Sequence, residues 1–428
     1  MSLGSSLQNA LSGLRVASKS AELISSNVAN ALTPGYARRE LSVSANTAVS
    51  GGVKINAVTR NENLAVLGEA RVASASVAGH SLKANFFENM TMVFGEIGSE
   101  SSLSQDVAHL TSALLVAQSQ PQDETRLASV VNAASGLVNR FHAISDKIQG
   151  ERQNADHSIS LTVEGLNRDL KQLERISHSL QRSQAGTSHH ATQLDTRNQV
   201  LDRVAQAIPI KVFERPDGSF AVYSTAGSAL MDIEAAEFSF ESTPTITATT
   251  DNLGALFLNG ELIANPRSVQ GGELGSLFEI RDVIAPKLQQ ELDQFAFSLA
   301  ASTQSADPDG NGIFLDRSQS INASLTSGFS SRISIAESID PSKGGDINRL
   351  RSGTDTPISA SSAAPFLTGL TNALGSEFME SSVQLVTKLN TETQFAIQDQ
   401  NFAAAYFNEL TAQAQSDGVN TDNEMQHL

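Results

Sequence analysis

MSLGSSLQNALSGLRVASKSAELISSNVANALTPGYARRE, residues 1–40, is the stretch around which the rest of this chain is organised. Apolar residues recur in it with alternating spacings of three and four, which is typical of a helix that packs along a coiled-coil seam. An isolated helix gains most of its stability from packing, so this helix requires a partner. The residues that we expect to form its seam are Leu3, Leu7, Leu11, Leu14, Ile24 and Val28.

The opening helix is expected to end at Thr33–Tyr36. Pro34 disfavours helical geometry in the residue before it, and Gly35 can adopt the positive φ of a type II turn. Apolar residues in the range 41–58 then indicate short strands or an extended arm around Gly51–Gly52. The alternative for this segment is a plain connecting loop.

Composition limits the classes of function. The chain has 428 residues, enough for two or three domains, and a formal net charge of −17, which argues against nucleic acid as a partner. It contains no cysteine, which excludes disulfides and thiolate metal sites. We find no apolar run long enough to span a membrane and no secretory signal peptide at the N-terminus. A protein of this kind that leaves the cell uses another route.

Helical spacing returns after the arm. It predicts helices over 62–94, 103–114 and 123–183, the last starting at Asp123-Glu124 and about 90 Å long at 1.5 Å per residue. A further helix over 191–207 is expected after a turn at Gly186. Such long helices favour a rod-like antiparallel pair or bundle.

The pattern changes at Pro209. Turn signals at Pro216–Ser219 and Asn259–Gly260 separate short strand-like segments, which predicts an antiparallel β module inserted between helical regions. The strand-like segments of its second half are 238–240, 245–247 and 256–258. Gly271–Gly272 is expected to close the module.

Helix is expected again over 273–303 and, last, over 375–415, before Gly418. Between them, 313–339 has mixed character with Ile333 and Ile335 strand-like, and 352–365 is typical of a flexible connection. We therefore predict a mainly α fold with an inserted antiparallel β module (α+β), in which the N- and C-terminal regions form one long-helix bundle. The predicted divisions are an assembly helix and arm (1–60), the first part of a helical rod (61–208), the β domain (209–272), a mixed connecting region (273–365) and a C-terminal helical segment that completes the rod (366–428).

No constellation of catalytic residues, cofactor site or metal site is found. Asp307–Gly312 resembles the start of a calcium loop, but the twelfth position is Ser318 rather than Glu, so a polar turn is the favoured interpretation. His189–His190 is interpreted as a surface pair beside a helix–helix turn. Arg38–Arg39 could bind phosphate, but in an acidic chain we expect the pair to meet a carboxylate on a neighbouring subunit.

Several motifs resemble a known family. Residues 5–7, 10–14 and 27–39 (SSL, ALSGL and NVANALTPGYARR) resemble the N-terminal signature of flagellar axial proteins, which include rod, hook and hook-associated proteins. Residues 270–282 (QGGELGSLFEIRD) and 292–299 (LDQFAFSL), the long helix and the segment Gly418–Met425 are similar to the hook-associated protein 1 family. The resemblance spans nearly the whole chain and is strongest at the N-terminus.

This resemblance implies a structural protein of the bacterial flagellum, located outside the cell and exported unfolded by the flagellar type III route. It implies head-to-tail helical assembly into the junction between hook and filament. The implied partners are other copies of the chain, the hook protein, a neighbouring junction protein or flagellin, and an export chaperone. Beside the apolar seam, the implied assembly interface contains Asn27, Asn30, Thr33, Pro34, Gly35, Tyr36, Arg38 and Arg39.

Two alternatives are weaker. A hook or distal-rod protein would lack the long helix after Pro121, and an exported cell-wall hydrolase would need paired carboxylates or a nucleophile. The family's C-terminal helix, which pairs with the N-terminal one, is expected to be missing, because the sequence stops at Leu428. We therefore expect Met1 to about Asn30 to be loosely packed in the isolated chain.

Overall fold

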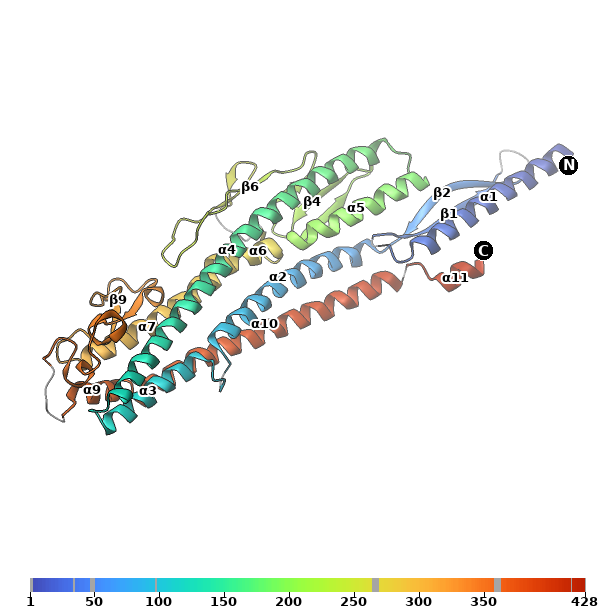
Figure 1. The fold of residues 1–428 in the computed structure, drawn as a ribbon. Coiled ribbons are helices and arrows are strands. Elements are labelled where there is room, and N and C mark those ends of the chain that lie inside the picture. The colour runs from blue at the N-terminus through green and yellow to red at the C-terminus, as the bar shows by residue number, and fades with distance from the viewer. Residues whose placement is uncertain are drawn as a thin grey trace.

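The chain forms an elongated molecule of long helices with both termini at the same end (Figure 1). This computed structural model describes residues 3–33, 35–46, 51–96, 98–263, 269–357, 363–416 and 418–427. Within them, most residues are helical and small antiparallel sheets are added at the side, so the predicted fold class is confirmed.

The helical body contains α2 (Leu64–Phe94), α3 (Leu103–Ser119), α4 (Glu124–Arg182), α5 (Ser188–Ala207) and α10 (Ser376–Ser416). Side-chain caps begin four of them: in each, an oxygen of the residue before the helix accepts a hydrogen bond from a first-turn N–H. These caps are Asn63, Ser102, Asp123 and Thr187. The predicted long helix over 123–183 and the last helix over 375–415 are both confirmed.

One continuous core runs along this body. Large side chains of α2, α3 and α4 are almost fully buried in it, including Phe94, Leu114 and Phe141. α10 packs lengthwise along α2, so that residues more than 300 positions apart in the sequence lie side by side (Figure 1). The prediction that N- and C-terminal regions build one bundle is therefore confirmed.

The β module consists of two antiparallel sheets of three strands each. The first contains β3 (Ile210–Glu214), β4 (Phe220–Ser224) and β5 (Ala229–Met231), and the second contains β6 (Phe238–Phe240), β7 (Leu256–Leu258) and β8 (Glu261–Leu262). The predicted turns are present: Gly218 between β3 and β4 and both residues of Asn259–Gly260 have positive φ.

The predicted strand at 245–247 is wrong. Polar side chains of α4 satisfy the backbone of this segment instead of a neighbouring strand: Gln153 accepts a hydrogen bond from Ile246 N at 2.8 Å, and Arg152 donates one to Thr247 O at 3.2 Å. Because these bonds fill the groups that a strand partner needs, the segment stays outside both sheets.

The predicted helix over 273–303 is interrupted. It consists of α6 (Glu273–Glu279), a π-helical turn (Ile280–Ile284) and α7 (Ala285–Ala306). Pro286 has no N–H to donate to the carbonyl four residues earlier, and the wider π turn, with Ala285 N bonded to Ile280 O, accommodates it. The turn places Arg281 in the core, where it pairs with the fully buried Asp156 at 2.6 Å.

The region after α7 is mixed, as expected. β9 (Phe314–Asp316) pairs with β10 (Ile333–Ile335). A short 3-10 turn at Phe329–Ser331 lies between them, and two more follow at Glu337–Ile339 and Pro341–Lys343. α8 (Arg349–Ser352) and α9 (Pro365–Ala373) lead into α10. Part of the predicted flexible connection at 352–365 lies outside the described residues.

The two ends of the chain meet beyond the helical body (Figure 1). α1 (Leu3–Asn30) lies beside an antiparallel hairpin of β1 (Arg38–Ala45) and β2 (Val53–Asn61), and the short α11 (Thr421–His427) packs against α1. The hairpin confirms the predicted extended arm, although Val49 lies outside the described residues. The proposed domain boundaries stay predictions.

Candidate assembly site

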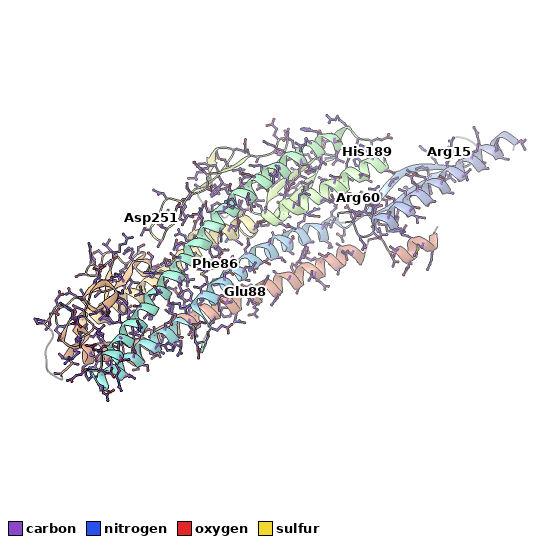
Figure 2. The ribbon with its side chains drawn as sticks, in the orientation of Figure 1. Arg15, Arg60, Phe86, Glu88, His189 and Asp251 are labelled. Atoms are coloured by element: carbon purple, nitrogen blue, oxygen red, sulfur yellow. The ribbon has the colours of Figure 1, made fainter. Side chains whose placement is uncertain are left out.

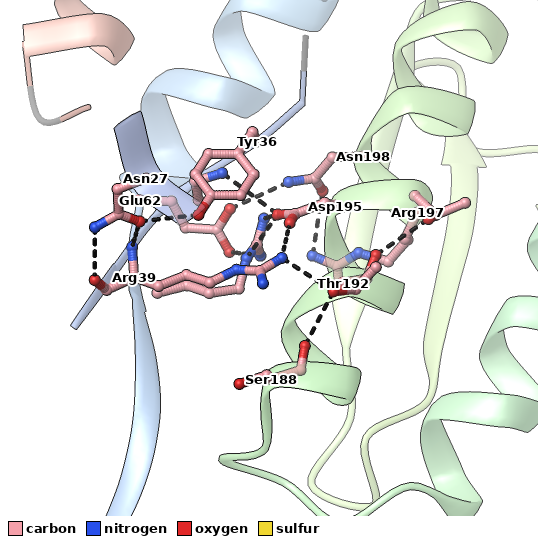
Figure 3. Close-up of polar contacts among 12 residues, drawn as sticks. Asn27, Tyr36, Arg39, Glu62, Ser188, Thr192, Asp195, Arg197 and Asn198 are labelled. Carbon is pink, nitrogen blue, oxygen red and sulfur yellow. Dashed lines mark hydrogen bonds and ion pairs between the residues drawn. The ribbon is translucent and has the colours of Figure 1, made fainter. Parts of the chain in front are cut away.

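Of the predicted assembly residues, Asn27, Tyr36 and Arg39 lie together where α1, the hairpin and α5 meet (Figure 3). α11 packs against α1 beside them. Asn27 is at the centre of this junction and is 1% exposed. Its amide accepts a hydrogen bond from the Arg39 backbone N–H at 3.0 Å and donates one to the Arg39 carbonyl at 3.0 Å, as a neighbouring strand would. Tyr36 donates its hydroxyl to the same side chain at 2.9 Å. Asn27 therefore fixes the chain as it leaves the turn.

The start of the hairpin is joined to α5 by charge. Arg39 Nη2 lies 2.5 Å from Asp195 Oδ2, and Arg60, at the end of β2, donates to Asp195 Oδ1 at 2.7 Å. Figure 2 shows Arg60 where the hairpin joins the helical body. Asp195 is buried and also accepts from Ala37 N at 3.3 Å. We call Asn27, Arg39, Arg60 and Asp195 the arm clamp.

A second layer surrounds the arm clamp. Glu62 accepts from Arg60 at 2.5 Å and from the side-chain amide of Asn198 at 3.1 Å. Arg197 donates to Glu214 at 2.8 Å, and burial lowers the pKa of this guanidinium despite that partner. Burial, followed by the nearby charges of Arg197 and Arg60, also lowers the pKa of His190. The arm clamp and the residues around it thus form a dense, mostly buried network of charges.

The C-terminal segment contributes the second carboxylate of the site. Glu424 in α11 is 2% exposed, and it accepts from Arg38 Nε at 2.5 Å and from Asn27 at 3.1 Å. Burial acts to lower the pKa of Arg38, but the hydrogen bond and the charge of Glu424, together with Glu40, raise it overall.

One expectation is corrected here. Arg38 and Arg39 meet carboxylates of their own chain, Glu424 and Asp195, rather than of a neighbouring subunit, because folding places α5 and α11 at the turn. The short α11 contributes Glu424 to this junction and packs against α1, while the expected absence of the longer C-terminal helix stays a prediction.

The turn needs glycine at position 35 because its backbone lies close to α5. Gly35 has φ of +76°, and a Cβ atom at this position would lie 2.8 Å from Cγ of Gln199 and 3.2 Å from the carbonyl of Asp195. Thr33 N–H bonds to the Asn30 carbonyl at 2.9 Å, and Tyr36 N–H bonds to the Thr33 carbonyl at 3.2 Å. The turn therefore sits directly on α5. Pro34 lies outside the described residues.

The leucines of the predicted seam are not brought into this site. Leu3, Leu7, Leu11 and Leu14 are between 47% and 91% exposed. The opposite face of α1 contacts the hairpin: Ser12 Oγ accepts a hydrogen bond from Val53 N at 3.1 Å. Ile24 and Val28, nearer the arm clamp, are half-buried.

Sequence reasoning missed Asp195, Arg60, Glu62, Asn198 and Glu424. A signal for two of them exists in the predicted helix over 191–207. Ala191, Asp195, Asn198 and Leu201 lie on one face of this helix, so two polar side chains interrupt an apolar stripe. No comparable signal marks Glu424, since its partner is 386 residues away.

The loop that resembles a calcium site is a polar turn. Asp307 accepts from Gly312 N at 2.9 Å and from the Thr354 hydroxyl at 2.5 Å. Asp309 accepts from Thr356, whose hydroxyl is the main cause of the lowered pKa of this carboxyl. The carboxylates thus join this loop to the segment after α8. In the described residues, no cluster of His, Cys, Asp and Glu side chains is suited to hold a metal ion.

Within the same described ranges, no helix combines the length and the apolar character needed to cross a membrane.

Comparison with known proteins identifies related chains. The chain is 23% identical over 330 residues to flagellar hook-associated protein 1 of Escherichia coli (strain K12), a match that covers 72% of this chain and 59% of that protein. It is 22% identical over 418 residues to flagellar hook-associated protein 1 of Bacillus subtilis (strain 168), covering 86% and 82%. The chain thus spans less than two thirds of the length of the E. coli relative.

Among solved structures, the flagellar hook junction protein FlgK from Burkholderia pseudomallei is similar, with 16% identity and a TM-score of 0.48 over 58% of this chain and 46% of that one. A family model described as the flagellar hook-associated protein FlgK helical domain matches residues 87–318, which is more than half of the chain. The chain therefore belongs to the flagellar hook-associated protein FlgK helical domain family.

Proposed function

We propose that this protein is a structural component of the bacterial flagellum that forms the junction between hook and filament. The observation that carries this proposal is the family match over the helical body, which bears at one end a helix with exposed leucines. The proposed role is assembly rather than catalysis.

The exposed leucines supply a physical reason to assemble. Covering a leucine side chain contributes roughly 1.5–3 kcal/mol relative to leaving it exposed. Four such residues on α1, at spacings of four, four and three, lie on one face and suit a helix of another subunit packed along the seam. Head-to-tail contacts of this kind generate open helical assemblies, which is what a tubular segment requires.

The proposal includes partners and a route. The neighbours are other copies of the chain, the hook protein on one side and a second junction protein or flagellin on the other. We propose export in an unfolded state by the flagellar type III route with an export chaperone, and a final location outside the cell.

A deletion strain of the source bacterium tests the function. We expect electron microscopy to find hooks without filaments and flagellin in the culture medium, and the intact gene to restore filaments. Normal filaments in the deletion strain would overturn the proposal.

A pair of variants tests the seam. Leu7→Ser with Leu14→Ser removes apolar side chains that contribute little to the isolated fold, and we expect export without filament restoration. Leu115→Ser with Leu325→Ser, at leucines that are 54% and 56% exposed and lie outside α1, is the control and should restore filaments. Equal restoration by both variants would count against the seam but leave the deletion result untouched.

A further inference from the structure

The outer face of α4 carries a row of exposed basic side chains. Arg168, Lys171, Arg175, His178 and Arg182 follow one another at alternating spacings of three and four, opposite the buried face of Leu166, Leu170, Leu173 and Leu180. Within the part of the chain that the structure describes, none of the four Lys and Arg side chains forms an ion pair. In a chain with a net charge of −17, such a row is unusual. We call these five residues the basic stripe.

α10 carries a row of exposed aromatic and acidic side chains. Phe395, Asp399, Phe402, Tyr406 and Glu409 also alternate at spacings of four and three and therefore lie on one face of the helix. The three aromatic side chains are between 49% and 76% exposed. Residues 389–428 contain six carboxylates and no lysine or arginine. We call the five residues the acidic-aromatic stripe.

The two stripes are placed where neighbouring copies could meet. The C-terminal half of α4 lies along the edge of the molecule opposite α10, and both helices run toward the end that holds the termini (Figure 1). Both stripes lie in the half of the molecule nearer that end. Two copies set side by side in the same orientation would therefore bring the α4 edge of one against the α10 edge of the next, with the helices parallel.

We propose that the basic stripe of one copy packs against the acidic-aromatic stripe of the neighbouring copy. This inference rests on the proposed function, since it assigns a lateral contact within the assembly. Lys and Arg heads pair with the carboxylates, and guanidinium groups lie over aromatic rings, an arrangement that gains strength as water is excluded. The shared three–four spacing allows the side chains of two parallel helices to interlock.

Charge complementarity identifies a second copy as the occupant. The patches differ from each other and each chain carries both, which is the pattern of a heterologous contact that repeats from subunit to subunit. A contact between like stripes is excluded, because it would place cations against cations or carboxylates against carboxylates.

A charge exchange tests the proposal in the deletion strain. Lys171→Glu with Arg175→Glu, and separately Asp399→Lys with Glu409→Lys, should each abolish filaments on the cells. All four changes in one chain restore the opposite charges across the contact and should restore filaments. Lys211→Glu with Arg317→Glu, exposed residues outside both stripes, is the matched control and should keep them.

The possible outcomes distinguish a failure of the proposed contact from a failure of the proposed junction function. If the unmodified gene restores filaments and both stripe variants do so equally, the contact is wrong and the junction function stands. If the variants fail and the fourfold variant also fails, although all are found folded by circular dichroism and exported, the stripes have another partner and the proposal is overturned.

Cysteine cross-linking gives an independent measurement, because the chain has no cysteine. Chains with Arg175→Cys and a second cysteine at Asp399, Phe402 or Tyr406, tested in turn, should form a ladder of linked subunits when isolated flagella are oxidised. Each single cysteine should give no ladder. Absence of a ladder from all three pairs in flagella that carry the variants would contradict the proposal.

Discussion

The helices α1 and α4 carry similar apolar patterns and end in opposite environments. In α4, Leu127, Leu137 and Ile148 are fully buried against the other helices of the body. In α1, Leu3, Leu7 and Leu14 are mostly exposed. A three–four spacing therefore specifies a helix with an apolar face, while the partner of that face depends on the rest of the fold.

The face of α1 that is used within the chain lies opposite the exposed leucines. Small and polar side chains lie on it, and Ser12, Asn27 and the buried Leu23 mark its length. A hairpin backbone approaches such a face closely and finds hydrogen-bond partners on it. The intrachain contact therefore leaves the leucine face free for another molecule.

The largest expected difference between the two helices is in hydrogen exchange. Amides in the centre of α4 should exchange only through global unfolding, so their opening free energy should equal the roughly 5–15 kcal/mol unfolding free energy of a native domain. Amides over 3–14 should be close to unprotected. Exchange measured by mass spectrometry on the isolated chain tests this. Comparable protection of both segments would show that α1 is stabilised without a partner.

Truncating one apolar side chain in each of the two helices should change the free energy of unfolding by very different amounts. Phe141→Ala leaves a cavity beside Phe295, whose ring centroid lies 5.9 Å away, and should lower the free energy of unfolding by about 3–5 kcal/mol. Leu14→Ala, at an exposed position, should change it by less than about 0.5 kcal/mol. Urea denaturation measures both. A large effect of Leu14→Ala would place that residue in a packed environment.

Asp195→Ala tests how the arm is attached to the body. It leaves the buried Arg39 without a carboxylate and Arg60 with Glu62 alone, and should weaken attachment of the hairpin by about 3 kcal/mol. Faster hydrogen exchange over 38–61 would report it. Asp169→Ala removes the partner of the exposed Arg203 and should cost at most about 1 kcal/mol. Similar exchange in both variants would mean that the arm clamp does not hold the arm.

Gly35→Ala should have the smallest effect of the set. Positive φ and the short approach to Gln199 together should cost about 2 kcal/mol of attachment free energy. Gly227→Ala is the control, because Gly227 also has positive φ but no atom within 4 Å of the added Cβ, so only the conformational cost of about 1 kcal/mol applies. An equal cost at both positions would remove the close approach from the explanation.

Most of the long elements could be predicted from the sequence, because local patterns define them. The ends of α4 follow from Asp123 and the turn at Gly186, and the hairpin between β3 and β4 follows from Pro216–Ser219. The failures have a common cause. The segment 245–247 has strand-like residues, but side chains of α4 bind its backbone. The π turn before Pro286 places Arg281 against the buried Asp156, a partner that the local pattern does not contain.

The candidate site divides in the same way. Asn27, Gly35 and Arg39 lie in one continuous stretch and could be selected from it, whereas Asp195 and Glu424 are supplied by distant parts of the chain. Pairing of such groups depends on distances that a one-dimensional pattern does not contain.

By itself, the sequence determined the helical character of the chain, the inserted β module, the absence of cysteine and the apolar row on the first helix, because these depend on composition and on local periodicity. Only the tertiary structure decided which face of α1 is covered, that Arg38 and Arg39 pair within their own chain, and that the basic and acidic-aromatic stripes lie on opposite edges of the molecule. These properties depend on how elements far apart in the sequence are placed, and packing of the whole core sets that placement.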